Sequence, residues 1–174
     1  MNWDKYFHTI CEAVASKSNC LSRQLGAILV RDKSIISTGY NGPPRGIPHC
    51  DSLYRREAII NSVANLPINI QHRLLTEFDI CPRKLMGFKS GEGLQNCNAA
   101  HAERNCLINA ARLGISTLNT TLYLNATVLP CKDCFLELIN AGITSIVVEE
   151  IKEYNDIEFL LKYSDIQVRT FSLE

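Results

Sequence analysis

Residues 101–150 read HAERNCLINAARLGISTLNTTLYLNATVLPCKDCFLELINAGITSIVVEE. Apolar residues recur at helical spacing in two segments that each end at a glycine, and a short apolar run follows each of them. From residue 101 onward we expect a helix at 101–113, a strand at 121–127, a helix at 132–141, a strand at 145–149, a helix at 156–162 and a strand at 166–171. Alternation of this kind predicts a layered α/β fold.

The first hundred residues add further elements to this fold. The expected elements are a helix at 1–16, two strands within 25–40 that meet at an Asp32–Lys33 turn, a loop at 41–50, helical segments within 51–78 with a break near Pro67, and an irregular stretch at 79–98. We expect a single domain over residues 1–174 with an insertion at about 51–98. An irregular stretch this long needs a function or a cross-link.

The composition disfavours several classes of function. The chain has 18 Lys and Arg against 18 Asp and Glu, which argues against a protein that holds nucleic acid through a basic surface. No apolar run approaches the roughly 18 residues of a membrane helix, and the amphipathic start does not resemble a signal peptide. We therefore expect a cytoplasmic protein without a nucleic-acid or membrane partner. Its eight cysteines then indicate metal binding, catalysis or packing rather than disulfides.

Two motifs at helix starts carry the clearest chemistry. One is His101-Ala102-Glu103, and the other is PCKDC at 130–134. A histidine and two cysteines, Cys131 and Cys134, can hold zinc and leave a fourth position for water, which is the arrangement of catalytic zinc sites. A carboxylate at Glu103 could transfer a proton beside that metal. A structural zinc site and a redox-active cysteine pair are the alternatives, and the redox alternative leaves the His101 motif unexplained.

These motifs form the H-x-E…P-C-x-x-C signature of zinc deaminases. The sequence resembles the cytidine deaminase superfamily, and within it the deoxycytidylate (dCMP) branch. The resemblance rests on HAERN at 101–105, PCKDC at 130–134 and RQLGAILVRDKSIISTGYNGPPRG at 23–46. It implies a three-layer α-β-α fold with a central mixed five-stranded sheet and helices on both faces.

The resemblance also implies a reaction, in which dCMP and water give dUMP and ammonia and so supply dUMP for dTMP synthesis. By position, His101, Cys131 and Cys134 would bind the catalytic Zn²⁺, and Glu103 would shuttle the proton. The candidate substrate contacts are Asn41, Ser22, Arg23, Ala102 and Tyr154. A turn-forming role for Asn41 and a surface-loop position for Tyr154 are the alternatives.

Regulation is a further implication of the resemblance. The dCMP branch is typically activated by dCTP and inhibited by dTTP, each with Mg²⁺, at a loop between subunits. The residues implied here are Gly42, Pro43, Arg45, Gly46 and Arg112. We therefore expect a homo-oligomer, either a tetramer or a hexamer. Arg112 could instead complement the dipole of its helix.

Four cysteines outside the signature suggest a second zinc site. Cys11 and Cys106 fit apolar helix faces, which leaves Cys20, Cys50, Cys81 and Cys97. Four thiolates would make a closed structural Zn²⁺ site, and some dCMP deaminases carry a second zinc with cysteines at the positions of Cys20 and Cys50. His49 could replace one thiolate, and four unbound thiols are the alternative.

Other functions share the same zinc chemistry. A nucleic-acid-editing deaminase would need a cationic, aromatic-bearing channel, which neutral charge and 7% aromatic residues disfavour. A non-enzymatic zinc module that binds nucleotides would have no use for Glu103. The GYNGPPRG element at 39–46 argues against a free cytidine or guanine deaminase.

Overall fold

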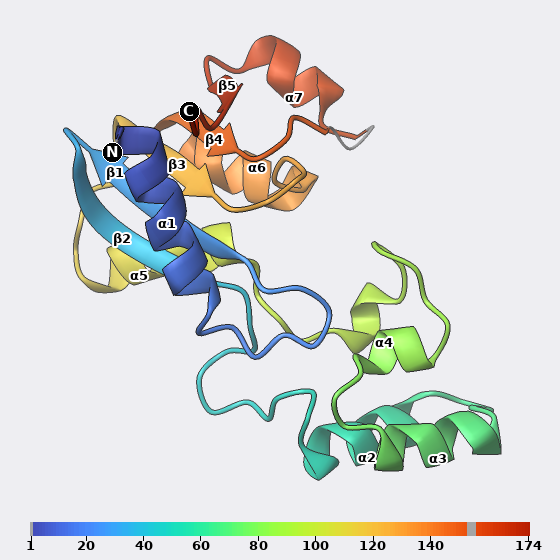
Figure 1. Ribbon diagram of the computed structural model, residues 1–174. Helices are drawn as coiled ribbons and strands as arrows, with labels where there is room; N and C mark the ends of the chain where they lie inside the picture. Colours follow the sequence, from blue (N-terminus) through green and yellow to red (C-terminus); the bar gives the residue numbers. More distant parts are fainter. Residues whose placement is uncertain (1, 153–155) are drawn as a thin grey trace. The chain divides into compact units, whose positions relative to one another are not determined.

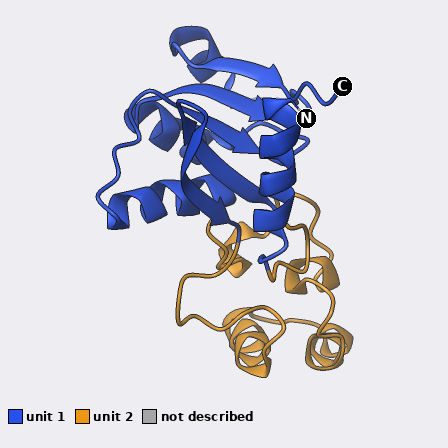
Figure 2. Ribbon diagram, turned by 60° about the vertical axis from the view of Figure 1, so that its left-hand side comes forward, with its two compact units in different colours: residues 1–18, 25–41, 101–174 blue, residues 19–24, 42–100 orange. Residues whose placement is uncertain are grey.

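The structure of the protein is a computed structural model that describes residues 2–152 and 156–174. The chain forms two compact units, which are coloured separately in Figure 2. The first contains residues 1–18, 25–41 and 101–174, and the second contains residues 19–24 and 42–100. The expected insertion at 51–98 falls inside the second unit. That the two units make a single domain stays a prediction.

The first unit is built on a five-stranded mixed sheet (Figure 1). Its strands are β1 (Gly26–Arg31), β2 (Ser34–Tyr40), β3 (Thr120–Leu124), β4 (Ile143–Val148) and β5 (Gln167–Thr170). They lie in the order β2-β1-β3-β4-β5, in which β1 is antiparallel to β2 and β3, and β3, β4 and β5 are parallel. Edge strand β2 shows mixed burial and edge strand β5 has only exposed and half-buried residues, whereas β1 is buried almost throughout because both of its faces are covered.

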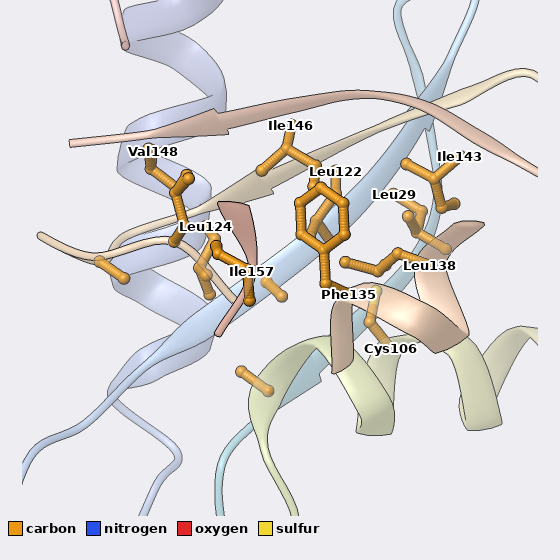
Figure 3. Close-up of a cluster of buried hydrophobic side chains, with 14 residues drawn as sticks. Leu29, Cys106, Leu122, Leu124, Phe135, Leu138, Ile143, Ile146, Val148 and Ile157 are labelled. Carbon is orange, nitrogen blue, oxygen red and sulfur yellow. The ribbon is translucent and has the colours of Figure 1, made fainter. Parts of the chain in front are cut away.

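Helices cover both faces of this sheet. They are α1 (Trp3–Ala15), α5 (Ala102–Arg112), α6 (Lys132–Asn140) and α7 (Glu158–Tyr163). Successive residues of β1 point to opposite faces, so Ile28 packs in one cluster with Phe7 of α1, and Leu29 packs in another with Cys106 of α5 and Phe135 of α6. Figure 3 shows the second of these clusters, in which α5 and α6 side chains meet β1, β3 and β4. The predicted three-layer α/β fold is confirmed.

Local sequence explains several element boundaries. Asn2 caps α1, since its side chain accepts a hydrogen bond of 2.7 Å from the Lys5 N–H. Asp32 and Lys33 both have positive φ values, 50° and 61°, as the two-residue turn of a twisted hairpin requires. The strand expected at 121–127 is shorter than predicted and ends at Leu124, because the Ala126 N–H turns back to the Leu124 carbonyl at 2.9 Å.

Gly39 lets β2 lie very close to α5. A Cβ at this position would stand 2.3 Å from the Cys106 nitrogen and 2.5 Å from the Ala102 oxygen, both of which are backbone atoms of α5. No larger side chain fits without a shift of the helix. The sheet therefore holds the start of α5, where His101 and Glu103 lie, at a short and defined distance.

The second unit consists of short helices and loops. They are α2 (Leu53–Ser62), α3 (Ile68–Thr76), α4 (Pro82–Leu85) and a 3₁₀ turn (Leu94–Asn96). The break expected near Pro67 is confirmed, since Pro67 precedes α3. Residues 79–98, expected to be irregular, include α4 and the 3₁₀ turn but are otherwise loop.

An arginine lies at the centre of the second unit. The core proper is small, with Ile59, Leu74 and Leu85 fully buried. Arg56 is also fully buried, at 0% exposure, and its guanidinium donates hydrogen bonds to four backbone carbonyls. The acceptors are the carbonyls of Cys50, Leu74, Phe78 and Ile80. One side chain thus joins the residues before α2 to α3 and to the loop that leads to Cys81.

No helix among the described residues has the length and apolar character needed to cross a bilayer.

Candidate metal centre

Two helix starts meet in the first unit. His101 is the N-cap residue of α5, and Cys131 is the N-cap residue of α6. Neither side chain caps its own helix, which leaves the imidazole and the thiol available to another partner. Cys134 lies one helical turn after Cys131 and is buried at 1% exposure. Backbone N–H groups at a helix start have no partner within the helix, and Ala102 and Cys131 stand at these two starts.

His101, Cys131 and Cys134 form a compact triangle of ligand atoms. The two Sγ atoms are 3.5 Å apart, and His101 Nδ1 lies 3.5 Å from Cys131 Sγ and 3.3 Å from Cys134 Sγ. Ligands placed tetrahedrally around zinc lie about 3.5–3.8 Å from one another. Within residues 2–152 and 156–174, this is the one group of three or more metal-ligating side chains whose ligand atoms all lie within 4.8 Å. The residues fit a zinc ion with an open fourth position.

Electrostatics favour the metal-binding form of this site. Hydrogen bonds from Cys134 and His101 lower the pKa of Cys131 to about 3, so its sulfur is a thiolate at neutral pH. The hydrogen bond to Cys131 also raises the pKa of His101. A thiolate is the form of cysteine that binds metals.

Glu103 is buried beside the triangle without a full set of partners. Its residue exposure is 4%, and its Oε1 lies 4.0 Å from His101 Nδ1. Its Oε2 is buried and has no hydrogen-bond partner among the described residues. Desolvation by burial raises the pKa of this carboxyl. An orphaned acceptor next to a metal site suits a group that acts on a bound ligand.

Asn41 is held at the end of β2 by two donors. Its Oδ1 lies 2.8 Å from the Leu25 backbone nitrogen and 2.8 Å from the Ser18 hydroxyl. The Leu25 carbonyl in turn accepts from the Asn41 N–H at 3.1 Å. Asn41 is buried at 7% exposure and belongs to the same unit as the metal triangle. Its assignment to substrate stays a prediction.

The remaining predicted residues divide between the two units. Arg112 lies in the last turn of α5, where it also suits the helix dipole. Ala102 is the first residue of α5 and is fully buried. The second unit contains Ser22, Arg23, Gly42, Pro43, Arg45 and Gly46. Tyr154 lies outside the described residues. The roles predicted for these residues stay predictions.

The four other cysteines gather in the second unit. Cys20, Cys50, Cys81 and Cys97 all belong to it. Burial, together with the neighbouring thiols of Cys81, Cys97 and Cys20, raises the pKa of the Cys50 thiol to about 11, so these three thiols lie near Cys50. They are not drawn together as tightly as the His101 triangle. Nearby in the sequence, the buried Nδ1 of His49 has no hydrogen-bond partner among the described residues.

Two residues that position the site were not among the predictions. Asn105 donates from Nδ2 to the Tyr40 carbonyl at 2.7 Å and so ties α5 to the end of β2. It stands inside the HAERN motif, where its spacing on the helix could have indicated a role. Ser18 lies in the turn after α1, and nothing in its local sequence points to Asn41.

Comparisons with known proteins agree with this geometry. The family profile described as "Cytidine and deoxycytidylate deaminase zinc-binding region" matches residues 1–150. The chain is 31% identical to the deoxycytidylate deaminase of Saccharomyces cerevisiae over 172 residues, which cover 98% of this chain and 45% of that protein. It is 30% identical to the deoxycytidylate deaminase of Mycobacterium phage D29 over 151 residues, which cover 84% of this chain and 93% of the phage protein.

A solved structure shows the same fold. The apo crystal structure of dCMP deaminase from the cyanophage S-TIM5 matches with a TM-score of 0.62 and 22% identity, covering 96% of this chain and 95% of that one. The chain spans a little under half the length of the yeast relatives that it matches. With the His-Cys-Cys triangle and the buried glutamate in place, the sequence match over residues 1–150 shows that the chain belongs to the cytidine and deoxycytidylate deaminase zinc-binding family.

Proposed function

We propose that this protein catalyses the hydrolytic deamination of dCMP to dUMP and ammonia. The observation that carries the proposal is the buried, unpartnered Oε2 of Glu103 beside the triangle of His101, Cys131 and Cys134. Relatives from yeast and phage are named deoxycytidylate deaminase. The cyanophage enzyme has been solved in complex with dCMP and dUMP.

The residues of the triangle would hold the catalytic zinc. Zinc bound there supplies a Lewis acid that lowers the pKa of a water molecule toward neutrality. The Glu103 carboxylate would accept one proton from that water and deliver it to N3 of the cytosine ring as the water oxygen bonds to C4. It would then take the remaining proton of that oxygen and deliver it to the amine, so that the C4–N bond breaks, the C4 carbonyl forms and ammonia leaves. Its raised pKa suits a group that must both accept and release a proton near neutral pH.

Several residues are our candidates for recognition of the nucleotide. The N–H groups at the starts of α5 and α6, at Ala102 and Cys131, donate to polar atoms of the ring. Asn41 contacts the sugar. Ser22, Arg23 and Tyr154 are our candidates for the 5′-phosphate end.

The test is loss of cytosine absorbance in the zinc-loaded protein. We expect turnover of dCMP and much slower turnover of cytidine and of a single-stranded oligonucleotide that contains deoxycytidine. Preferred turnover of the oligonucleotide would favour an editing deaminase instead. A zinc-loaded protein that deaminates none of the three would refute the proposal.

We also propose that the activity is regulated and feeds dTMP synthesis. Glycines and Arg45 in the loop of residues 42–46 suit phosphate binding, since glycine allows close backbone approach and arginine offers a fork of donors. With Mg²⁺, dCTP would activate and dTTP would inhibit the enzyme, which we expect to be a homo-oligomer, either a tetramer or a hexamer. Arg112 would contact the phosphates of the regulatory nucleotide. Turnover that is indifferent to dCTP would remove this part of the proposal. A cytoplasmic location stays a prediction.

A second, structural zinc completes the proposal. Its ligands would be Cys20, Cys50, Cys81 and Cys97, which all lie near Cys50 in one compact unit. Such a site would cross-link a unit whose apolar core is small. We expect Cys50→Ser to lower bound zinc from two ions per chain to one, and Cys106→Ser, a buried cysteine outside both clusters, to leave two. An unchanged count in Cys50→Ser would exclude Cys50 from any metal site.

A further inference from the structure

Two consecutive arginines, Arg55 and Arg56, stand at the start of α2. A helix carries partial positive charge at this end, so acidic residues are favoured there and cations are disfavoured. The first turn of α2 contains no acidic residue. Asp51 and Asp79 lie near Arg56, whereas the half-buried Arg55 forms no ion pair with a carboxylate among the described residues. A positive charge in this position calls for another negative partner.

Arg56 shapes the backbone around the thiol cluster, by which we mean Cys20, Cys50, Cys81 and Cys97. Its Nε donates to the carbonyl of Cys50, and its Nη2 donates at 2.7 Å to the carbonyl of Ile80, the residue before Cys81. Because its guanidinium is fully used by backbone carbonyls, Arg56 fixes where two of the cysteines stand but has little left to offer their sulfurs.

Arg55 contacts the thiol cluster at a different point. Its Nη2 donates at 2.6 Å to the carbonyl of Asn96, the residue before Cys97. Burial is the main cause of the raised pKa of Cys50, and the positive charge of Arg55 opposes it, so this charge lies close to the Cys50 sulfur. The Nε of Arg55 is buried and has no hydrogen-bond partner among the described residues. A buried donor without an acceptor costs free energy, and an anionic sulfur is a strong acceptor for it.

Two more buried polar atoms without partners flank the thiol cluster. They are Nδ1 of His49, next to Cys50, and Oδ1 of Asn98, next to Cys97. Of the five such atoms found among the described residues, three therefore belong to neighbours of the cluster. The place where hydrogen-bonding groups remain unsatisfied is thus the place where the thiols gather, and this fits a cluster that holds a charged group.

A zinc ion bound by four thiolates would leave two negative charges on the site, since each sulfur carries one and the metal carries two positive charges. Buried charge is costly unless it is paired and hydrogen-bonded. On the basis of the second zinc site proposed above, we propose that Arg55 is the charge partner of its thiolates. The guanidinium offsets part of their negative charge, and its Nε–H donates to one of the sulfurs.

A merely structural Arg55 would tie α2 to Asn96 and nothing more. Any side chain with an N–H donor of similar reach would then replace it. A charge partner needs the positive charge itself. Arg55→Lys keeps that charge, whereas Arg55→Gln keeps a neutral N–H donor and loses it, so this pair of variants separates the two roles.

The experiment measures the affinity of each zinc ion for the full chain, with the thiols kept reduced. A chromogenic chelator withdraws the zinc, and the ion of the second site is identified by its absence in Cys50→Ser. We expect Arg55→Gln to raise the Kd of that ion about 10- to 100-fold, the usual effect of losing a partner outside the metal ligands. The ion at the triangle of His101, Cys131 and Cys134 should be released as in wild type. Arg55→Lys should bind the second ion more tightly than Arg55→Gln.

Asn98→Ala is the matched control. Asn98 Nδ2 donates at 3.2 Å to the Pro48 carbonyl, so this side chain is a neutral tie between the residues before Cys50 and those after Cys97. We expect this variant to keep the Kd of the second ion within about threefold of wild type, as for one weak neutral hydrogen bond. Equal losses in Asn98→Ala and Arg55→Gln, equal affinities in Arg55→Lys and Arg55→Gln, or wild-type affinity in Arg55→Gln would each overturn the inference.

A measurement on the wild type does not depend on how the variants fold. The Nε–H group of each arginine gives its own NMR signal, which is assigned through the bonds of its residue. We expect the Arg55 signal to shift, and its exchange with water to slow, as zinc fills the second site. The signal of Arg73, which pairs with Glu77 on the exposed side of α3, should stay in place. An Arg55 signal that does not respond to zinc would also overturn the inference.

The zinc content of the wild type separates this inference from the second zinc site on which it rests. Wild type that binds two ions per chain, with the second held equally well by all Arg55 variants, overturns only the role of Arg55. Wild type that binds a single ion, at the triangle of His101, overturns both proposals. Neither result depends on turnover of dCMP.

Discussion

Replacement of Glu103 by glutamine separates catalysis from zinc binding and folding. Glutamine has nearly the same size and shape, so it fills the buried space of Glu103 without a cavity. It cannot accept and return a proton near neutral pH. Because Glu103 is not one of the three residues of the metal triangle, we expect Glu103→Gln to bind zinc like wild type and to lose turnover of dCMP.

The size of the loss follows from the position of the carboxyl. Proton transfer by one positioned group contributes about 10²- to 10⁴-fold to a rate. Glu103 serves two transfers in the proposed reaction, to N3 and to the leaving amine, so we expect kcat to fall by about 10⁴-fold, or about 5.5 kcal/mol in the barrier. The stability of the folded protein should increase in this variant. Burial raises the pKa of Glu103, which means that the folded protein disfavours its charged form, and a neutral amide removes that cost.

Three measurements on one preparation test this reasoning. They are the rate of absorbance loss from dCMP, the zinc content per chain and the melting temperature. Glu137→Gln is the matched control, since Glu137 is a partly exposed carboxylate on α6 that pairs with Arg104 at 2.9 Å and does not touch the triangle. We expect it to retain turnover within about threefold, as an exposed ion pair contributes little. Turnover within tenfold of wild type in zinc-loaded Glu103→Gln would refute the proton-shuttle role.

Three further predictions concern the fold around the site. Gly39→Ala should displace α5, since the added Cβ would stand 2.3 Å from the Cys106 nitrogen. We expect this variant to lose about 2–3 kcal/mol of stability and to turn over dCMP more slowly. Thr38→Ala, at the neighbouring exposed position, should change neither stability nor turnover. Arg56→Met leaves four backbone carbonyls without their buried donor, so urea unfolding should show a loss of stability above about 3 kcal/mol, whereas the exposed Arg73→Met should cause a much smaller loss; equal losses would contradict the central role of Arg56. Asp4→Asn removes a pair with Arg169 at 2.9 Å that lowers the Asp4 pKa below 3.8. The pair stabilises the protein by about 1 kcal/mol above pH 4 and loses this effect as pH falls through the lowered pKa, so the difference in melting temperature between variant and wild type should shrink in acid. A difference that is constant from pH 7 to pH 2 would exclude the ion pair as its cause.

The metal triangle was predictable because its geometry is largely local. Cys131 and Cys134 are one helical turn apart, so any helix that starts at residue 131 brings both sulfurs to one side. His101 also stands at a helix start, and parallel strands place such starts along one edge of a sheet. The alternation of helices and strands after residue 100 indicated that sheet, and its composition of five mixed strands followed from the resemblance.

The tertiary structure alone decided the roles of several buried residues. Arg56 stands in the polar run LYRREA at 53–58, which reads as an exposed helix face, yet it is fully buried because four carbonyls from distant turns converge on it. Gly39 belongs to a quoted motif, but its need for a missing Cβ appears only once α5 lies across β2. Such contacts join residues far apart in the chain, and local spacing carries no information about them.

Ser18 is the clearest example of a contact that the sequence does not predict. Its neighbours in the sequence mark only the end of a helix, whereas its hydroxyl reaches Asn41, 23 positions later, because α1 and β2 end side by side. The metal ligands and the proton shuttle could therefore be predicted from the sequence, since these roles need particular side chains at particular spacings. The orientation of the residue expected to hold the substrate depends on long-range packing, and that packing exists only in the folded chain.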